Sequence, residues 1–337
     1  MMLRVSVSAL LIVVIGFGCV LPDAGAPGAA TFIVSSVADL IAALENLPAE
    51  GGRIIVCEGT YVLTASIDIN RDNVIIEGEG PATFFTLADG VNGPCFVVGE
   101  PTPAQPTVTH HHIVLRNLRI SGNRAGQTSE QSTVPGREHL RVNGITLRQV
   151  GDCTVEDVVV ESARSGGIVL ELTCNNILLR GITTSDNFFD RIAVDGSSTD
   201  STITECTCRN NLAAGISFDI GPSSNRVVNS TLVDNGTTGV FIRDSRRNLF
   251  SDCFIARNGQ DGVFIADGDG PGAAATENTF SANYYVDNGR NGIWQAGPNS
   301  TDNVVDGGVF QGNAANAIEE SFPLTAPLVE YDVTIVP

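Results

Sequence analysis

A glycine followed by isoleucine or valine recurs along most of the chain at a nearly constant interval, and this repeat limits the possible folds more than any other feature. We call its aliphatic residues the anchors: Ile145, Ile168, Ile192, Ile216, Val240, Val263, Ile293 and Ile318. A series of asparagines recurs in step with them: Asn187, Asn211, Asn235, Asn258, Asn288 and Asn313. Repeats of 23 to 30 residues are typical of solenoids, in which one repeat cannot bury its apolar face until its neighbours stack on it.

The composition indicates that each repeat is made of strands. The chain of 337 residues contains 36 glycines and is 42% hydrophobic, which is enough to bury a sizeable core. Short apolar runs are separated by Gly, Asn, Asp and Ser, the residues of tight turns. Side chains alternate along a strand, so each anchor and the residue two places on face the interior. The sequence therefore predicts an all-β fold, a parallel β-helix in which each turn of the chain is one rung.

One segment near the start has a different period. The stretch SSVADLIAALENLPAEGG, residues 35–52, carries Val37, Leu40, Ile41, Leu44 and Leu47 at helical spacing after a serine that suits the N-cap position. This pattern predicts a short helix. We expect the helix to cover the first rung, where an exposed strand edge would favour aggregation.

The rungs resemble the right-handed parallel β-helix of the pectate-lyase-like superfamily, which includes pectate lyases, polygalacturonases and mannuronan epimerases. The resemblance covers roughly residues 31–320. It implies a right-handed solenoid with an N-terminal capping helix and a polysaccharide as the partner. Two segments remain: 1–30, interpreted as a signal peptide or lipoprotein signal with a linker, and 321–337, interpreted as a C-terminal cap or tail.

Residues 1–30 have the features of an export signal. An apolar run from Val5 to Phe17 follows an early arginine and precedes small residues and prolines. The stretch Gly16–Cys19 is similar to a bacterial lipoprotein cleavage box, so Cys19 is a candidate for lipidation and membrane anchoring; cleavage after Ala30 is the alternative. We therefore expect a secreted, periplasmic or cell-surface protein, whose other cysteines are small buried residues.

The charge narrows the choice of partner. The formal net charge is −19, and all 19 basic residues are arginine. Such a surface repels nucleic acid and anionic membranes. It suits cations such as Ca²⁺ and neutral partners, whereas a polyanionic substrate requires a local basic patch or a bridging metal.

Two columns of outward side chains follow from the repeat. The third residue after each anchor gives a charged column, and the first gives a column that becomes aromatic toward the C-terminus. The charged column reads Arg148, Glu171, Asp195, Asp219 and Arg243, and the aromatic residues are Phe241, Phe264 and Trp294. Stacked carboxylates about 5 Å apart raise one another's pKa or require a cation, which marks a candidate functional site. The alternative is a solvated face on which Arg148 pairs with Glu171 and Arg243 with Asp219.

Two further residues are candidates for chemistry. Arg191 replaces the glycine before an anchor and adjoins Asp190. We interpret Arg191 as a group that binds a substrate carboxylate or acts as a base, the alternative being a surface pair with Asp190. An insertion at 124–140 interrupts the rung spacing, and long loops on rigid scaffolds often wall a site. His139, at its end, is a candidate general base, the alternative being an exposed loop histidine.

The resemblance implies three chemistries for this column. In pectate lyases, acidic residues on neighbouring strands bind Ca²⁺ and an arginine takes the proton before β-elimination; the metal ligands would be Glu171, Asp195 and Asp219, with Arg191 or Arg243 as the base. Glycoside hydrolysis needs only two of these carboxylates. The epimerase signature Tyr-Gly-x-Asp-Pro-His is not matched at 190–195, and the polygalacturonase signatures Asn-Thr-Asp, His-Gly and Arg-Ile-Lys are absent.

We therefore expect an exported polysaccharide lyase-type enzyme that acts on a uronate polymer with Ca²⁺ assistance. Arg148 is expected to bind substrate, and the aromatic column to stack on sugar rings, or alternatively to cover the loop at 266–278. Two alternatives stay open: a glycoside hydrolase that uses two of the three carboxylates, and a non-catalytic cell-surface protein that binds carbohydrate or acts in adhesion.

Overall fold

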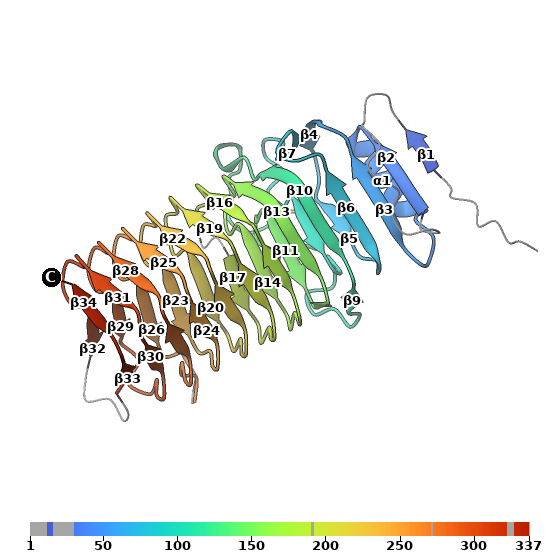
Figure 1. The fold of residues 1–337 in the computed structure, drawn as a ribbon. Coiled ribbons are helices and arrows are strands. Elements are labelled where there is room, and N and C mark those ends of the chain that lie inside the picture. The colour runs from blue at the N-terminus through green and yellow to red at the C-terminus, as the bar shows by residue number, and fades with distance from the viewer. Residues whose placement is uncertain (1–11, 16–29, 190–191, 271, 322–326, 337) are drawn as a thin grey trace, which may run out of the picture.

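The chain forms an elongated solenoid of parallel strands, which the computed structural model describes for residues 12–15, 30–189, 192–270, 272–321 and 327–336 (Figure 1). Within these ranges two long sheets run the length of the molecule and a third, sheet C, pairs β9 (His110–His111) with β12 (Val150–Gly151). All strand pairs within the three sheets are parallel, as predicted. The signal-like residues 16–29, with Cys19, lie outside the described residues.

Sheet B has one strand in each turn of the solenoid. Its strands are β5 (Ile67–Ile69), β8 (Phe96–Val98), β11 (Ile145–Arg148), β14 (Ile168–Glu171), β17 (Ile192–Asp195), β20 (Ile216–Asp219), β23 (Val240–Arg243), β26 (Val263–Ala266), β29 (Ile293–Gln295) and β32 (Ile318–Glu320).

Sheet A receives two short strands from most turns, with a bend between them. Its strands are β1 (Ile12–Ile15), β2 (Ala30–Val34), β3 (Gly52–Val56), β4 (Gly59–Leu63), β6 (Val74–Gly78), β7 (Thr83–Leu87), β10 (Val114–Ser121), β13 (Thr154–Glu161), β15 (Leu178–Arg180), β16 (Thr183–Ser185), β18 (Thr202–Thr204), β19 (Thr207–Arg209), β21 (Arg226–Val228), β22 (Thr231–Val233), β24 (Leu249–Ser251), β25 (Phe254–Ala256), β27 (Thr279–Ser281), β28 (Tyr284–Val286), β30 (Val304–Asp306), β31 (Val309–Gln311), β33 (Val329–Tyr331) and β34 (Thr334–Val336). Sheet A thus continues past residue 320, where the sequence predicted a cap or tail.

The anchors stack in register, as the repeat predicted. Each anchor is the direct partner of the next, from Ile145 opposite Ile168 to Ile293 opposite Ile318. The anchors from Ile145 to Ile293 are fully buried, and they join side chains of sheet A in one continuous core. The seven described cysteines are also buried, as predicted.

Asparagine ladders lock the bends of successive rungs together. The predicted series is joined by side-chain hydrogen bonds from Asn211 to Asn235 and onward to Asn313. A second ladder, which the sequence analysis missed, runs from Asn225 to Asn303 along another bend. Apart from the partly buried Asn313, these side chains are buried, so each amide bonded to the next rung satisfies polar groups that would otherwise be costly to bury.

The predicted capping helix is present. Helix α1 (Val37–Asn46) begins at Ser36, whose hydroxyl accepts a hydrogen bond from the Asp39 amide. Leu40 and Leu44 are buried against the N-terminal end of the core, whereas Ile41 is exposed. The solenoid is therefore covered at this end by α1 (Figure 1).

Charged residues of alternating sign line the outer face of the N-terminal part of sheet A. We call this series the sheet A ladder: Arg53, Glu77, Arg116, Glu156 and Arg180. Each neighbour in it forms an ion pair with the next, from Arg53 with Glu77 to Glu156 with Arg180. Like charges never adjoin along this ladder, so stacking charged residues costs little here.

Candidate functional site

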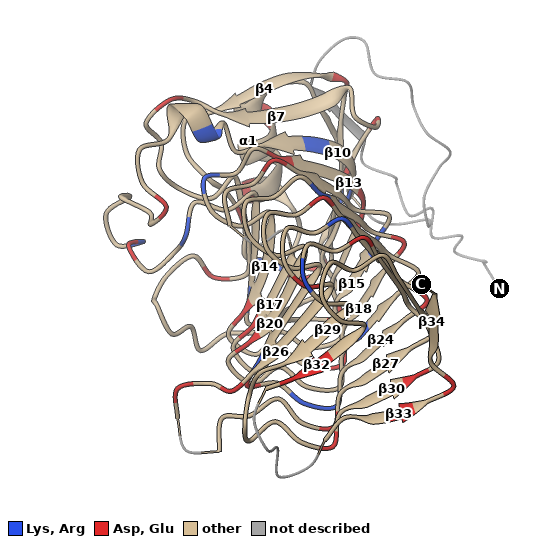
Figure 2. Cartoon of the chain, turned by 90° about the vertical axis from the view of Figure 1, so that its left-hand side faces the viewer, with Lys and Arg blue, Asp and Glu red and all other residues tan. Residues whose placement is uncertain are grey.

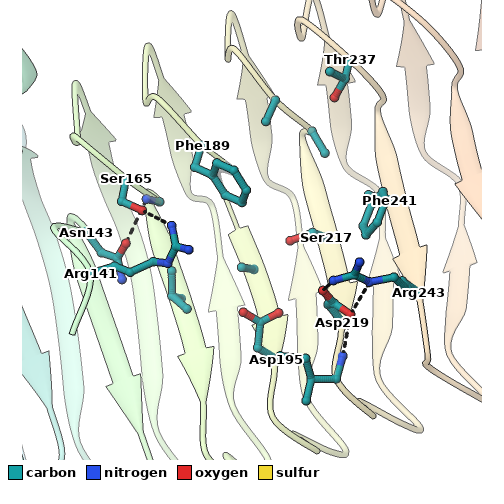
Figure 3. A pocket seen from close by; sticks show the side chains of 16 residues that line it. Arg141, Asn143, Ser165, Phe189, Asp195, Ser217, Asp219, Thr237, Phe241 and Arg243 are labelled. Atoms are coloured by element: carbon teal, nitrogen blue, oxygen red, sulfur yellow. Dashed lines mark hydrogen bonds and ion pairs between the residues drawn. The ribbon is translucent and has the colours of Figure 1, made fainter. Parts of the chain in front are cut away.

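A groove of about 520 Å³ crosses the outer face of sheet B between β11 and β23 (Figure 3). It is lined by Arg141, Asn143, Ser165, Gly166, Val169, Phe189, Ala193, Asp195, Ala213, Ala214, Ser217, Asp219, Ile220, Thr237, Phe241 and Arg243. The groove arises from the residues that directly follow the anchors. These are the small Ala193 and Ser217 on two adjacent strands and the large Phe241 on the next strand. The small side chains form the floor of the groove, and the Phe241 ring forms one end.

Asp219 and Arg243 form an ion pair at one end of the groove. Nε and Nη2 of Arg243 donate to the two carboxylate oxygens of Asp219 at 3.0 and 2.5 Å. The hydrogen bond to Asp219 raises the pKa of Arg243 above its ordinary value, against the opposing effect of burial. The pair with Asp219 thus favours a charged Arg243 that can hold an anion, and the role of Arg243 as a base stays a prediction.

Asp195 lies beside this pair. It is the register partner of Asp219 on the adjacent strand, and both carboxyl groups face the groove (Figure 3). Adjacent strands are about 4.8 Å apart. The predicted neighbourhood of two like charges therefore exists at Asp195 and Asp219. Arg191, which the sequence analysis placed at the start of this strand, lies outside the described residues, and its role stays a prediction.

Glu171 and Arg148 form a separate, buried pair. Nε of Arg148 lies 2.6 Å from Oε1 of Glu171, and the Arg148 side chain is 1% exposed. The same guanidinium donates to the backbone carbonyls of Glu100, Pro101 and Ala104. Burial raises the pKa of Glu171 above its ordinary value, although the positive charge of Arg148 opposes the shift.

Arg148 thus holds the loop that follows β8 rather than facing solvent. Neither Arg148 nor Glu171 lines the groove. This burial does not favour the prediction that Arg148 binds substrate. The sequence could not reveal this, because the loop that covers Arg148 belongs to no repeat.

His139 lies beside Arg148. Its Nε2 is 3.1 Å from the Pro101 carbonyl oxygen and 3.0 Å from Nη1 of Arg148. Burial and the charge of Arg148 lower the pKa of His139. His139 does not line the groove, so the geometry does not favour its predicted part as a base. The insertion that carries it instead reaches sheet B through a two-bond ion pair between Arg137 and Asp68.

The three predicted metal ligands do not make a metal site in this structure. Among the described residues, no group of three or more His, Cys, Asp or Glu side chains is arranged to hold a metal ion. Glu171 and Asp219 are each paired with an arginine, which supplies the positive charge that a cation would provide. As paired in this structure, these carboxylates do not fit Ca²⁺, and the binding of calcium stays a prediction.

The predicted aromatic column is continuous but presents ring edges. The rings of Phe241 and Phe264 are stacked at 5.8 Å with an interplanar angle of 28°, and Trp294 follows at 4.9 Å. The guanidinium of Arg290 lies 4.1 Å from the centre of the Trp294 ring. Because the ring faces are used inside the column, the geometry does not favour sugar stacking on it, and that role stays a prediction.

The sequence analysis missed two residues at the other end of the groove. Phe189 is 44% exposed, and the guanidinium of Arg141 lies 5.3 Å from the centre of its ring. Arg141 also donates to the Ser165 hydroxyl at 3.5 Å. Both residues lie in bends rather than on anchor strands, where no repeat signal marks them. An apolar ring and a cation thus border the groove opposite the Asp219–Arg243 pair (Figure 3).

These features define a parallel β-helix with a groove on one sheet, lined by two aspartates and two arginines. The model of the family described as right handed beta helix region matches residues 143–313, about half of the chain, and the chain belongs to this family. A search of curated proteins found no match. In the described residues, no helix is long and apolar enough to span a membrane.

Solved structures with the same fold include carbohydrate-active enzymes. The A-module of mannuronan C-5 epimerase AlgE4 from Azotobacter vinelandii is 16% identical, with a TM-score of 0.66 over 90% of this chain and 92% of that one. Endo-xylogalacturonan hydrolase from Aspergillus tubingensis is 14% identical, with a TM-score of 0.63 over 91% and 92%. A variant of the periplasmic alginate epimerase AlgG is 13% identical, with a TM-score of 0.54 over 90% and 84%. At these identities the likeness shows the fold alone.

Proposed function

We propose that this protein binds a uronate-containing polysaccharide in the sheet B groove and cleaves it by β-elimination. The observation that carries the proposal is the adjacency of Asp195 and Asp219 beside a charged arginine in one groove. The structural neighbours named for mannuronan, alginate and xylogalacturonan support the class of substrate, because these polymers contain uronic acids. An exported protein would meet such polymers at the cell surface.

The roles follow from charge and position. Arg243 binds the carboxylate of the bound uronate. This contact neutralises the carboxylate and makes the proton on the neighbouring C5 carbon more acidic. Asp195 takes the proton from C5, the electron pair forms the C4–C5 double bond, and the C4–O bond breaks. The leaving oxygen accepts a proton from a water molecule, and the proton on Asp195 restores that water. Asp219 keeps Arg243 oriented through its two hydrogen bonds. Phe189 offers its exposed face to a sugar ring.

Hydrolysis by the same carboxylates fits less well. A spacing of about 5 Å between adjacent strands is near the separation of a retaining pair. Such a pair needs one carboxyl group that donates a proton. Asp219 uses both oxygens to accept hydrogen bonds from Arg243, so it is an acceptor rather than an acid.

A second candidate function is binding without catalysis. The ion pairs of Arg148 with Glu171 and of Arg243 with Asp219 favour it, because two of the three predicted carboxylates are neutralised within the protein. The protein would then be a rigid rod that carries a carbohydrate-binding groove.

The test compares wild type with Asp195→Asn on alginate, polygalacturonate and a neutral glucan. Absorbance of unsaturated uronate and release of reducing ends are followed together, with Ca²⁺ or with a chelator. We expect absorbance to rise on the uronate polymers and to fall about 10²- to 10⁴-fold in the variant, which loses its base. Since the carboxylates as paired do not fit Ca²⁺, we expect activity to survive the chelator.

The matched control is Glu156→Gln, which removes a carboxylate from the sheet A ladder on the other face and should leave the activity unchanged. Reducing ends without absorbance would show hydrolysis instead. Binding without either signal would favour the non-catalytic function, and loss of activity in the chelator would restore the Ca²⁺ prediction.

A further inference from the structure

A strip without acidic side chains lies on the outer face of sheet A in the C-terminal part of the solenoid. We call it the sheet A strip. Its outward side chains on β19, β22, β25 and β28 are Thr207, Arg209, Thr231, Phe254, Tyr284 and Val286, which are exposed or partly exposed, whereas Val233 and Ala256 of the same strands are buried. Of the neighbouring strands, β18, β24 and β27 carry no charged residue, and β21 carries Arg226 (Figure 2). The chain has a net charge of −19, so a surface strip without acidic side chains differs from its average composition.

Acidic residues border the strip on both sides. Glu205 and Asp252 lie in the bends that precede β19 and β25, and Asp234 and Asp287 lie in the bends that follow β22 and β28. The strip is therefore only three residues wide, about 10 Å. A broad acidic protein surface would meet these carboxylates, whereas a single extended polymer fits between them.

Two aromatic side chains stand exposed on this strip. Phe254 and Tyr284 are register partners on adjacent strands and are 38% and 51% exposed. No ring contact joins these two side chains, in contrast to the stacked rings of Phe241 and Phe264 on sheet B. Both rings are therefore accessible to a ligand, and the apolar face of a sugar ring is the kind of group that such rings bind.

Arg209 supplies a positive charge at the N-terminal end of the strip. It is exposed, and it makes no ion pair with any residue in the described part of the chain. Arg257, next to the strip, is held instead by two hydrogen bonds to Asp234. Arg209 lies two rungs from Phe254, about 10 Å along the solenoid. Between them, Thr231 offers a hydroxyl on the same face.

We propose that the sheet A strip is a second binding site, on a different sheet from the groove, for an acidic polysaccharide. The polymer runs along the solenoid axis, with sugar rings on Phe254 and Tyr284 and a carboxylate or sulfate group on Arg209. The strip rests on residues that the groove does not use, so this inference is independent of the proposed reaction. Its function is to hold the protein on a polymer while the groove engages another segment.

The repeat of the fold favours a polymer over a small molecule. Equivalent positions recur about every 4.8 Å along the axis, so the strip offers a row of similar contacts rather than one enclosed pocket. Each contact is weak by itself, and a polymer gains from several at once. An acidic polymer is favoured because Arg209, unlike Arg257, has no carboxylate partner in the described part of the chain and lies on the same face as the two exposed rings.

The test is affinity electrophoresis in native gels that contain alginate, polygalacturonate or a neutral glucan. We expect both acidic polymers to retard the wild type and the neutral glucan to leave its migration unchanged. Phe254→Ala/Tyr284→Ala and, separately, Arg209→Gln should each weaken retardation about tenfold. The charge-matched control is Arg180→Gln, which removes an arginine that is paired with Glu156 on the same sheet and should leave retardation nearly unchanged.

The groove variant Asp195→Asn separates this site from the proposed reaction. It should lower cleavage about 10²- to 10⁴-fold and keep the retardation, whereas Arg209→Gln should keep cleavage of short oligouronates and weaken the retardation about tenfold. Equal retardation of wild type, Arg209→Gln and the double variant would overturn the inference. So would equal losses in Arg209→Gln and Arg180→Gln, or self-association of the wild type that the same substitutions remove. Arg209→Gln keeps the test valid if the double variant folds poorly, because it changes one exposed side chain.

Discussion

Sheet A and sheet B each carry a column of charged residues on the outer face, and the two columns differ in how they avoid repulsion between stacked charges. On sheet A the ladder from Arg53 to Arg180 alternates in sign, and each residue pairs with its neighbours. On sheet B the order is Arg148, Glu171, Asp195, Asp219, Arg243, so three acids lie between two arginines. Alternation shows that this fold can stack charges without repulsion. The run of acids on sheet B is therefore unnecessary for folding, which is the reason to assign it to a ligand.

The two columns also differ in burial. The Arg148 side chain is 1% exposed, whereas that of Arg180 is 48% exposed. Arg148 is covered by the loop after β8 and bonds three of its carbonyls. One end of the sheet B column is thus part of the core, and the groove occupies its middle and its other end.

The largest expected effect comes from Arg148→Met. The variant leaves Glu171 as an unpaired, partly buried carboxylate and frees three backbone carbonyls. We expect it to lower the free energy of unfolding by about 3–5 kcal/mol, measured by urea denaturation. Arg180→Met, which breaks an exposed pair, should cost no more than about 1 kcal/mol. Equal costs for the two variants would mean that the burial of Arg148 does not matter.

An intermediate effect is expected from pH, with opposite signs on the two faces. Burial alone would raise the pKa of Glu77, but hydrogen bonds from Arg53 and Arg116 outweigh it and hold that pKa below its ordinary 4.5. The contribution of Glu77 to stability is present above 4.5 and is lost as pH falls through the lowered pKa. Burial raises the pKa of Glu171 above 4.5, so its contribution is present below 4.5 and is lost as pH rises through the raised pKa.

The comparison is made with Glu77→Gln and Glu171→Gln, which no longer titrate. The free energy of unfolding of wild type minus that of Glu77→Gln should increase between about pH 3 and 6, and the corresponding difference for Glu171→Gln should decrease. Slopes of the same sign would contradict the contrast between the two faces.

The smallest effect is expected from Glu156→Gln in the sheet A ladder. Glu156 contacts both Arg116 and Arg180 at a partly exposed position. The variant should lose about 1 kcal/mol or less at low ionic strength, and the loss should shrink in 1 M salt because exposed pairs are screened. A loss that salt does not change would show that the ladder acts through packing rather than charge.

Much of the fold followed from the sequence because stacking repeats the same contact in every turn. The anchors, the predicted asparagine ladder and the order of the sheet B column all depend on spacing alone, and the structure has them as expected. Helix α1 could be predicted from its N-cap serine and from the helical spacing of its apolar residues. The residues with a left-handed backbone in these bends lie one position before the ladder asparagines, as at Asp186 and Asp234.

The details of the site depend on segments that do not repeat. The loop after β8 buries Arg148, and nothing in the spacing of Arg148 distinguishes it from Arg243. Phe189 lies in a bend, outside both predicted columns. Ring orientation is a further limit: the period places Phe241 beside Phe264 but does not say that each ring covers its neighbour's face.

Because the rungs stack in the same register, whole turns of the solenoid can be removed or inserted. Because every turn begins and ends at equivalent positions of sheet B, removing the chain between two anchors would bring together strands that are now second neighbours. Deleting the turn that carries Asp195 would place Glu171 against Asp219 without changing any surviving strand. The surface residues of such a protein can therefore change by deletion or insertion of whole turns as well as by single substitutions. An ordinary globular core does not allow changes of this size.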